Sequence, residues 1–164
     1  MATPTTLPAT FVSGNTLLAS QLNDLRGAFR VLQVVQGTLS TTFATTSTSF
    51  VTTGLTATIT PSSTSSLVLV VYAGSQGNAS GQDVFTTVFR GTTAGTNLGT
   101  TNGFVKVYST AGGTTSSGAS AIILDTPATA SAQVYTVAMK TSGGSGYWSN
   151  DATRSSITLM EISA

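Results

Sequence analysis

The sequence has no histidine, no cysteine and few charged residues. Without cysteine there is no disulfide framework and no thiolate nucleophile, and without histidine there is no Ser-His-Asp triad and no imidazole metal site. Charged residues make up 7% of the chain, whereas a typical globular domain has about 25%. Such a chain is typical of a structural building block, so we expect no enzyme activity, no metal and no cofactor.

The low charge also restricts the partners. The formal net charge is +1, which gives little attraction to nucleic acid or to an anionic membrane. No segment reaches the roughly 18 apolar residues that a membrane span needs, and residues 1–14 lack the pattern of a signal peptide. We expect no nucleic-acid partner and no membrane insertion. Weak repulsion between copies favours an oligomer or a lattice component.

The residues that are present indicate a folded β protein. Serine and threonine make up about a third of the chain, hydrophobic residues make up 40%, and there are seven Phe, four Tyr and one Trp. Aromatic and β-branched residues together with a low net charge argue against disorder. A length of 164 residues is enough for one domain with a sizeable core.

The first 30 residues differ from the rest, and we expect them to form an arm and an anchoring helix. Pro4 and Pro8 predict an extended arm over residues 1–15. The run TLLASQLNDLRGAF predicts a helix over residues 16–29.

One stripe of this helix is apolar, with spacings of 4, 3 and 4 residues: Leu18, Leu22, Leu25 and Phe29. Such spacing is the seam pattern of a short coiled coil between copies. The alternative is a helix that packs on the β-body of its own subunit. We predict that these four residues serve oligomerisation or attachment.

Residues 31–164 predict an all-β body, an antiparallel sandwich or jelly-roll-like head. Short β-type runs separated by turn residues are expected at 31–36, 39–44, 50–60, 67–73, 83–90, 104–109, 119–125, 132–140, 146–149 and 155–162. In the third run, Leu55, Ala57 and Ile59 alternate with threonines, which predicts one buried face. The continuously apolar run 67–73 predicts a buried central strand.

Carboxylates are the remaining route to hydrolysis, notably of glycans. The acids are far apart in the sequence, although a fold can bring two together: Asp24, Asp83, Asp125, Asp151 and Glu161. We expect Asp24 on the helix surface and the other three aspartates at strand ends or turns, where Asp bonds local backbone. Glu161 is expected at an outward position of the last strand. We therefore predict no catalytic residue.

Tyr147 and Trp148 are the candidate surface contact, because an aromatic pair in a Gly-rich hairpin can stack on a sugar or dock a partner. The alternative is aromatic packing at the end of the sandwich or at a subunit interface.

The run FATTSTSFVTTGLTATITPSSTSSLVLVVYAG, residues 43–74, resembles a segment of small Ser/Thr-rich β-domains in tailed-phage virion proteins of the fibre-like or head-decoration type. The runs 88–93, 124–140 and 155–162 fit the same domain, and residues 10–35 are similar to the anchor segment that precedes such domains. The resemblance implies a trimer with a jelly-roll-like head, and it transfers no catalytic residues.

We therefore expect a phage virion surface protein, made in the host cytoplasm and assembled onto the particle through residues 1–30. The absence of a shaft favours a homotrimeric capsid decoration (a cement or head-fibre protein) seated on the major capsid protein. The alternative is a short tail-fibre or receptor-binding tip, joined to a tail protein and touching a host surface glycan or protein receptor. A glycan-degrading tail enzyme and a cellular adhesin are further alternatives, and the missing signal peptide counts against the adhesin.

Overall fold

A computed structural model describes residues 31–79, 81–110, 113 and 115–163 of the chain. The predicted arm and helix, with Leu18, Leu22, Leu25 and Phe29, lie outside the described residues, and so does Asp24. The described part begins with a strand at Val31, where the predicted β-body begins.

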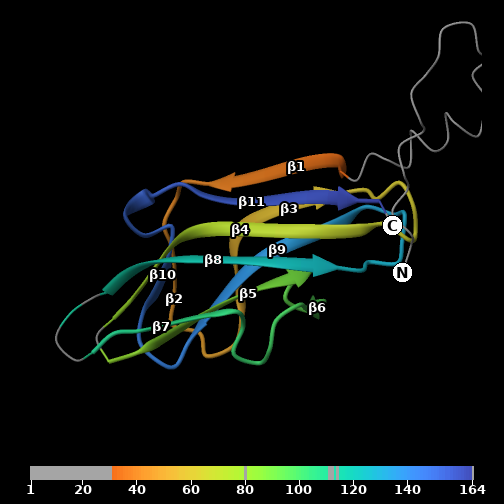
Figure 1. Cartoon of the computed structure of the whole chain (residues 1–164). Coiled ribbons are helices and arrows are strands. Elements are labelled where there is room, and N and C mark those ends of the chain that lie inside the picture. Colours follow the sequence, from red (N-terminus) through yellow and green to blue (C-terminus); the bar gives the residue numbers. More distant parts are fainter. Residues whose placement is uncertain (1–30, 80, 111–112, 114, 164) are drawn as a thin grey trace, which may run out of the picture.

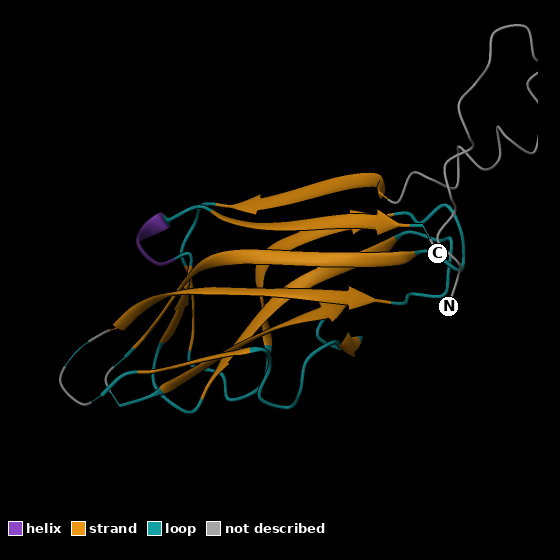
Figure 2. Ribbon diagram, viewed as in Figure 1, coloured by secondary structure: helices purple, strands orange, loops and turns teal. Residues whose placement is uncertain are grey.

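The described part is built almost entirely of strands (Figure 2). They are β1 (Val31–Leu39), β2 (Phe43–Thr45), β3 (Val51–Ile59), β4 (Leu67–Asn78), β5 (Asp83–Arg90), β6 (Thr96–Asn97), β7 (Val105–Tyr108), β8 (Thr115–Asp125), β9 (Gln133–Thr141), β10 (Gly146–Trp148) and β11 (Ser155–Ile162), with the short 3₁₀ turn η1 (Asn150–Ala152) before β11.

The strands form two antiparallel sheets that pack face to face (Figure 1). The first sheet has six strands in the order β1-β11-β4-β10-β2, and β8 also pairs with β4. Residues 68–73 of β4 pair with both β11 and β8, so these two strands lie on opposite edges of β4. The second sheet has five strands in the order β3-β9-β5-β6, and β7 also pairs with β5. The predicted all-β sandwich is confirmed.

The core lies between the sheets and follows the two-residue period of the strands. Leu55, Ala57 and Ile59 of β3 are buried while the threonines between them are exposed, as predicted. The other buried hydrophobic residues of the core cluster are Val68, Val70, Tyr72, Val84, Val88, Ala119, Tyr135, Val137, Met139, Trp148, Ile157 and Leu159.

The β4 strand is central, as predicted, but only alternate residues of its apolar run are buried. Val68 and Val70 point into the core, whereas Leu69 and Val71 lie on the outer side and are partly exposed. The prediction of a wholly buried strand was wrong because each sheet of a sandwich is covered on one face only.

Gly37, expected between two strands, lies inside β1. A Cβ atom there would come within 1.9 Å of the backbone oxygen of Thr56 in β3. This glycine therefore lets the edge of the first sheet approach the second sheet closely.

Candidate functional site

Glu161 is buried, which corrects the predicted outward position. It lies on the inner side of β11 with Ile157 and Leu159, and its side chain is 1% exposed. Alternation along β11 decides this, because the apolar residues at 157 and 159 fix the inward face and 161 shares it.

Four hydrogen bonds surround the Glu161 carboxylate. Oε1 accepts bonds from the backbone N–H of Ser62 at 2.7 Å, the Ser62 hydroxyl at 2.6 Å and the Ser66 hydroxyl at 2.7 Å. Oε2 accepts a bond of 2.6 Å from Nε2 of Gln33. We call Glu161, Ser62, Ser66 and Gln33 the Glu161 cluster.

These bonds determine the ionisation of Glu161. Burial alone raises the pKa of a carboxyl group, but the bonds from Ser62, Gln33 and Ser66 outweigh burial and lower the pKa of Glu161 to about 2. The buried group is thus an ionised and fully bonded carboxylate. It fastens the turn between β3 and β4 to β11, which is a structural role.

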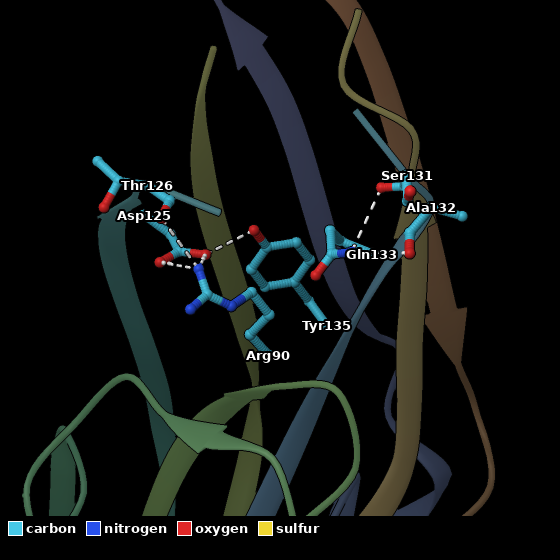
Figure 3. A network of polar contacts seen from close by, with 7 residues as sticks. All are labelled: Arg90, Asp125, Thr126, Ser131, Ala132, Gln133 and Tyr135. Atoms are coloured by element: carbon cyan, nitrogen blue, oxygen red, sulfur yellow. Dashed lines mark hydrogen bonds and ion pairs between the residues drawn. The ribbon is translucent and has the colours of Figure 1, made fainter. Parts of the chain in front are cut away.

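Asp125 at the end of β8 holds the two sheets together. Nη1 of Arg90 lies 3.1 and 3.0 Å from the two carboxylate oxygens of Asp125, and the hydroxyl of Tyr135 donates to Oδ2 at 2.7 Å. Arg90 and Tyr135 come from β5 and β9 of the second sheet, and both point at the aspartate (Figure 3). Burial, the bond to Asp125 and its negative charge raise the pKa of Tyr135 and keep its hydroxyl protonated, although the Arg90 charge acts in the opposite direction.

Asp125 and Glu161 both pair with Val68, so they share one row of the first sheet. Two strand spacings, about 9.6 Å, separate their backbones. A glycosidase pair needs one carboxyl group with a raised pKa as general acid, but the pKa of Glu161 is lowered and each carboxylate is occupied by its own donors. This arrangement suits structural linkage and not acid catalysis.

The other described acids also have local roles. Asp83 begins β5 and lies 3.0 Å from Nζ of Lys106, and Asp151 lies in η1, so the expectation of aspartates at strand ends and turns is confirmed for the described ones. Within residues 31–163 as described, no three acidic side chains gather as a metal site would require. The same residues contain no helix long and apolar enough to cross a membrane.

Tyr147 and Trp148 point in opposite directions from β10. Trp148 is fully buried and packs against Tyr72, with ring centroids 6.1 Å apart, whereas Tyr147 is partly exposed. The predicted surface contact is therefore wrong for Trp148, and the packing alternative holds. Gly74 makes room for the indole, since a Cβ atom there would lie 2.5 Å from a ring carbon of Trp148.

The outer face of the second sheet combines aromatic rings with positive charge. Phe85 pairs in register with Lys106 on one side and Lys140 on the other. The Lys140 ammonium lies 5.2 Å from the centre of the Phe85 ring and 4.9 Å from that of Phe50, both within cation–π range. This face is charged and partly covered by its own side chains.

The outer face of the first sheet, unlike that of the second, is uncharged and mostly apolar. Its residues align in rows across β1, β11, β4 and β8: Val31, Ile162 and Leu67; Val34, Met160, Leu69 and Leu124; Gln36, Thr158, Val71 and Ile122; Thr38, Ser156, Ala73 and Ser120. We call these four rows the outer apolar face. None of the fifteen residues carries a charge, and Ile122, Val34 and Leu124 are 73%, 58% and 57% exposed.

This face is the candidate interaction surface that sequence reasoning missed. Its strands were predicted, but their order in the sheet was not, and the face exists only because β11 lies between β1 and β4 while β8 lies beyond β4. A contiguous exposed apolar area on a folded domain marks an interaction site. Among the described surfaces, this one is best suited to bind a partner.

No family model and no curated protein matches this chain. Among solved structures, that of infectious bursal disease virus Gx strain aligns with a TM-score of 0.47 and 16% identity, over 79% of this chain and 32% of that chain. The VP2 subviral particle of the same virus aligns with a TM-score of 0.42 and 14% identity, over 80% of this chain and 33% of that one. The Gt strain gives a TM-score of 0.40 and 13% identity, over 80% and 38%. This chain thus spans about a third of the length of those chains.

Proposed function

We propose that this chain is a structural protein on the surface of a tailed-phage particle. In this proposal it is a homotrimeric capsid decoration, attached to the major capsid protein through residues 1–30, with the β-sandwich facing outward. It acts by binding and carries out no chemistry.

One observation supports the proposal: the segment that resembles phage virion β-domains is an ordered part of this sandwich. Residues 43–74 run through β2, β3 and the first part of β4, and their Ser/Thr turn supplies Ser62 and Ser66 to the buried Glu161 carboxylate. The resemblance therefore spans strands of both sheets and the turn that joins β3 to β4.

The surfaces agree with a binding role. The carboxylates of Asp83, Asp125 and Glu161 are engaged in ion pairs or hydrogen bonds within the domain. What the domain offers outward is an uncharged apolar sheet face, which suits assembly.

The proposal is tested by cryo-electron microscopy of the virus particle whose genome encodes this chain. Particles from a deletion strain serve as the control, so that any density lost can be assigned. We expect trimers over the icosahedral head, and capsids that lose stability when the protein is omitted.

Other locations contradict the proposal in different ways. Density only at the tail, with loss of host adsorption in the deletion strain, favours the short tail-fibre or receptor-binding tip. Absence of the chain from the particle overturns both the decoration and the tail assignment.

A further inference from the structure

We propose that the outer apolar face is where copies of this chain bind one another. The inference deepens the proposed function, on whose homo-oligomer it rests, and names the surface that holds the oligomer together. The occupant of the face is a second copy of the chain.

The exposed apolar side chains of this face adjoin one another, and such a surface indicates a binding site. Val34 and Leu124 occupy the two edge strands of one row, with Met160 and Leu69 between them. In the next row, Ile122 is the most exposed large hydrophobic residue of the described chain, at 73%. Exposed apolar side chains that adjoin in this way mark an interface, whereas singly scattered ones do not.

The size of the face fits an interface between subunits. Four strands at about 4.8 Å and four rows at about 6.8 Å cover roughly 500 Å² in projection. A standard interface buries about 800 Å² per partner. The face therefore supplies the greater part of such an interface, and its margins supply the remainder.

The absence of charge identifies the partner as another copy. A basic or acidic partner would have to leave its own charges unpaired against this face, at a cost in desolvation. Around the three-fold axis of a trimer, each copy presents the same uncharged surface to its neighbours, and the net charge of +1 opposes association only weakly.

The outer face of the second sheet is less suited to contact between copies than the outer apolar face is. It carries Lys140 and the Lys106–Asp83 ion pair around Phe85, so contact between two such faces would require these charges to lose water. Copies that approach through the first sheet avoid that cost. The charges thus direct association to the uncharged sheet.

The edge strands favour the same partner. The β1 and β8 strands contain nine and eleven residues and no Pro or Lys, the residues that usually protect an exposed edge from other chains. These two open edges can therefore also pair with strands of another copy.

The test measures the mass of the full-length chain in solution by light scattering coupled to size-exclusion chromatography. Val34→Asp and Ile122→Asp place a charge on the face at positions that are exposed in the subunit, so folding is preserved. Val134→Asp is the matched control, because Val134 is exposed on the second sheet, at 39%. We expect an oligomer for the wild type and for Val134→Asp, and monomers for both face variants, with unchanged circular dichroism.

A second measurement does not depend on the charged variants. Because the chain has no cysteine, Ile122→Cys introduces a single thiol on the face. We expect maleimide to react with that thiol at least tenfold more slowly in the oligomer than after dilution to monomers. A thiol at position 134, from Val134→Cys, should react equally fast in both states.

Three results would overturn the inference: a wild-type chain that stays monomeric, face variants that keep the oligomer mass, or a thiol at position 122 that reacts equally fast at all concentrations. These results are distinguishable from failure of the proposed function, which is decided by location on the particle. Trimers on the virion with this face exposed would refute the inference alone. An oligomer joined by this face but absent from the virion would refute only the proposed function.

Discussion

The hydroxyl of Ser66, just before β4, donates a hydrogen bond of 2.7 Å to Oε1 of Glu161 in β11, 95 residues later in the chain. Ser62 donates to the same oxygen through both its hydroxyl and its backbone N–H. A single carboxylate therefore organises the Ser/Thr-rich turn, and each serine that binds it is expected to contribute measurably to stability.

Glu161→Gln should destabilise the sandwich by about 2–3 kcal/mol, because an amide NH₂ group would face donors that now bond a carboxylate. Ser66→Ala should cost about 1–2 kcal/mol because the buried carboxylate loses one of its hydrogen-bond donors. Ser63→Ala is the matched control, since the Ser63 hydroxyl lies in an exposed contact with Ser65. Urea unfolding followed by circular dichroism measures all three, and equal stability of the wild type and Glu161→Gln would refute the role of the cluster.

Acid should weaken the fold through the same residue. The pKa of Glu161 falls from its ordinary 4.5 to about 2 in the folded chain. Between these values the unfolded chain binds more protons, so stability falls as pH falls from about 4.5 to 2, by on the order of 3 kcal/mol. Unfolding midpoints in urea across this range should therefore differ in slope between the wild type and Glu161→Gln, and parallel profiles would contradict the assignment.

Removing the hydroxyl should lower the stability of the fold at one buried tyrosine, Tyr135, and leave it nearly unchanged or higher at the other, Tyr72. Tyr135→Phe removes the 2.7 Å bond to Asp125 in the Arg90 network and should cost about 1–3 kcal/mol. Tyr72→Phe is the comparison, because the Tyr72 hydroxyl is buried and bonds no other described residue; its stability should stay within about 1 kcal/mol of the wild type or rise. Thermal unfolding measures both, and similar losses for the two variants would show that the Asp125 network adds nothing.

Leu22→Asp and Leu25→Asp should abolish trimer formation or virion attachment while the β-sandwich stays folded, because each puts a charge on the predicted apolar stripe. Leu17→Asp, off the stripe by one residue, is the control and should leave attachment intact. Sedimentation of the purified chains and binding to particles lacking the protein measure the two effects. Attachment that survives both stripe variants would refute the predicted seam.

Local pattern was sufficient to predict most of the strands, although β6 lies in none of the predicted runs. It also predicted the buried face of β3, because Leu55, Ala57 and Ile59 alternate with threonines. The predictions for Glu161 and Trp148 were wrong because both side chains are buried by partners distant in the sequence, Ser62 and Ser66 in one case and Tyr72 in the other. Alternation with Ile157 and Leu159 does place residue 161 on the inner face of β11. No local signal shows the distant donors that allow a carboxylate to be buried there.

The glycine-rich segments were harder to predict than the apolar ones. Gly37 lies between the predicted runs 31–36 and 39–44, yet it is inside β1, where its lack of a side chain lets the strand pass close to Thr56. The Ser-rich residues before 119 lie outside the predicted runs, yet β8 begins at Thr115 and pairs with β4 as far as Asn78. Pairing across the sheet overrides the weak strand preference of Gly and Ser there.

The first and last described strands are neighbours: β1 pairs with β11, and β11 lies between β1 and β4. During synthesis, β1 therefore has no partner in the first sheet until β11 has been made, and until then the Ser62 and Ser66 hydroxyls have no carboxylate. Such long-range pairing makes folding slow and leaves apolar surface exposed in the incomplete chain. We therefore expect the nascent protein to aggregate more readily while β11 is missing than after β11 has paired.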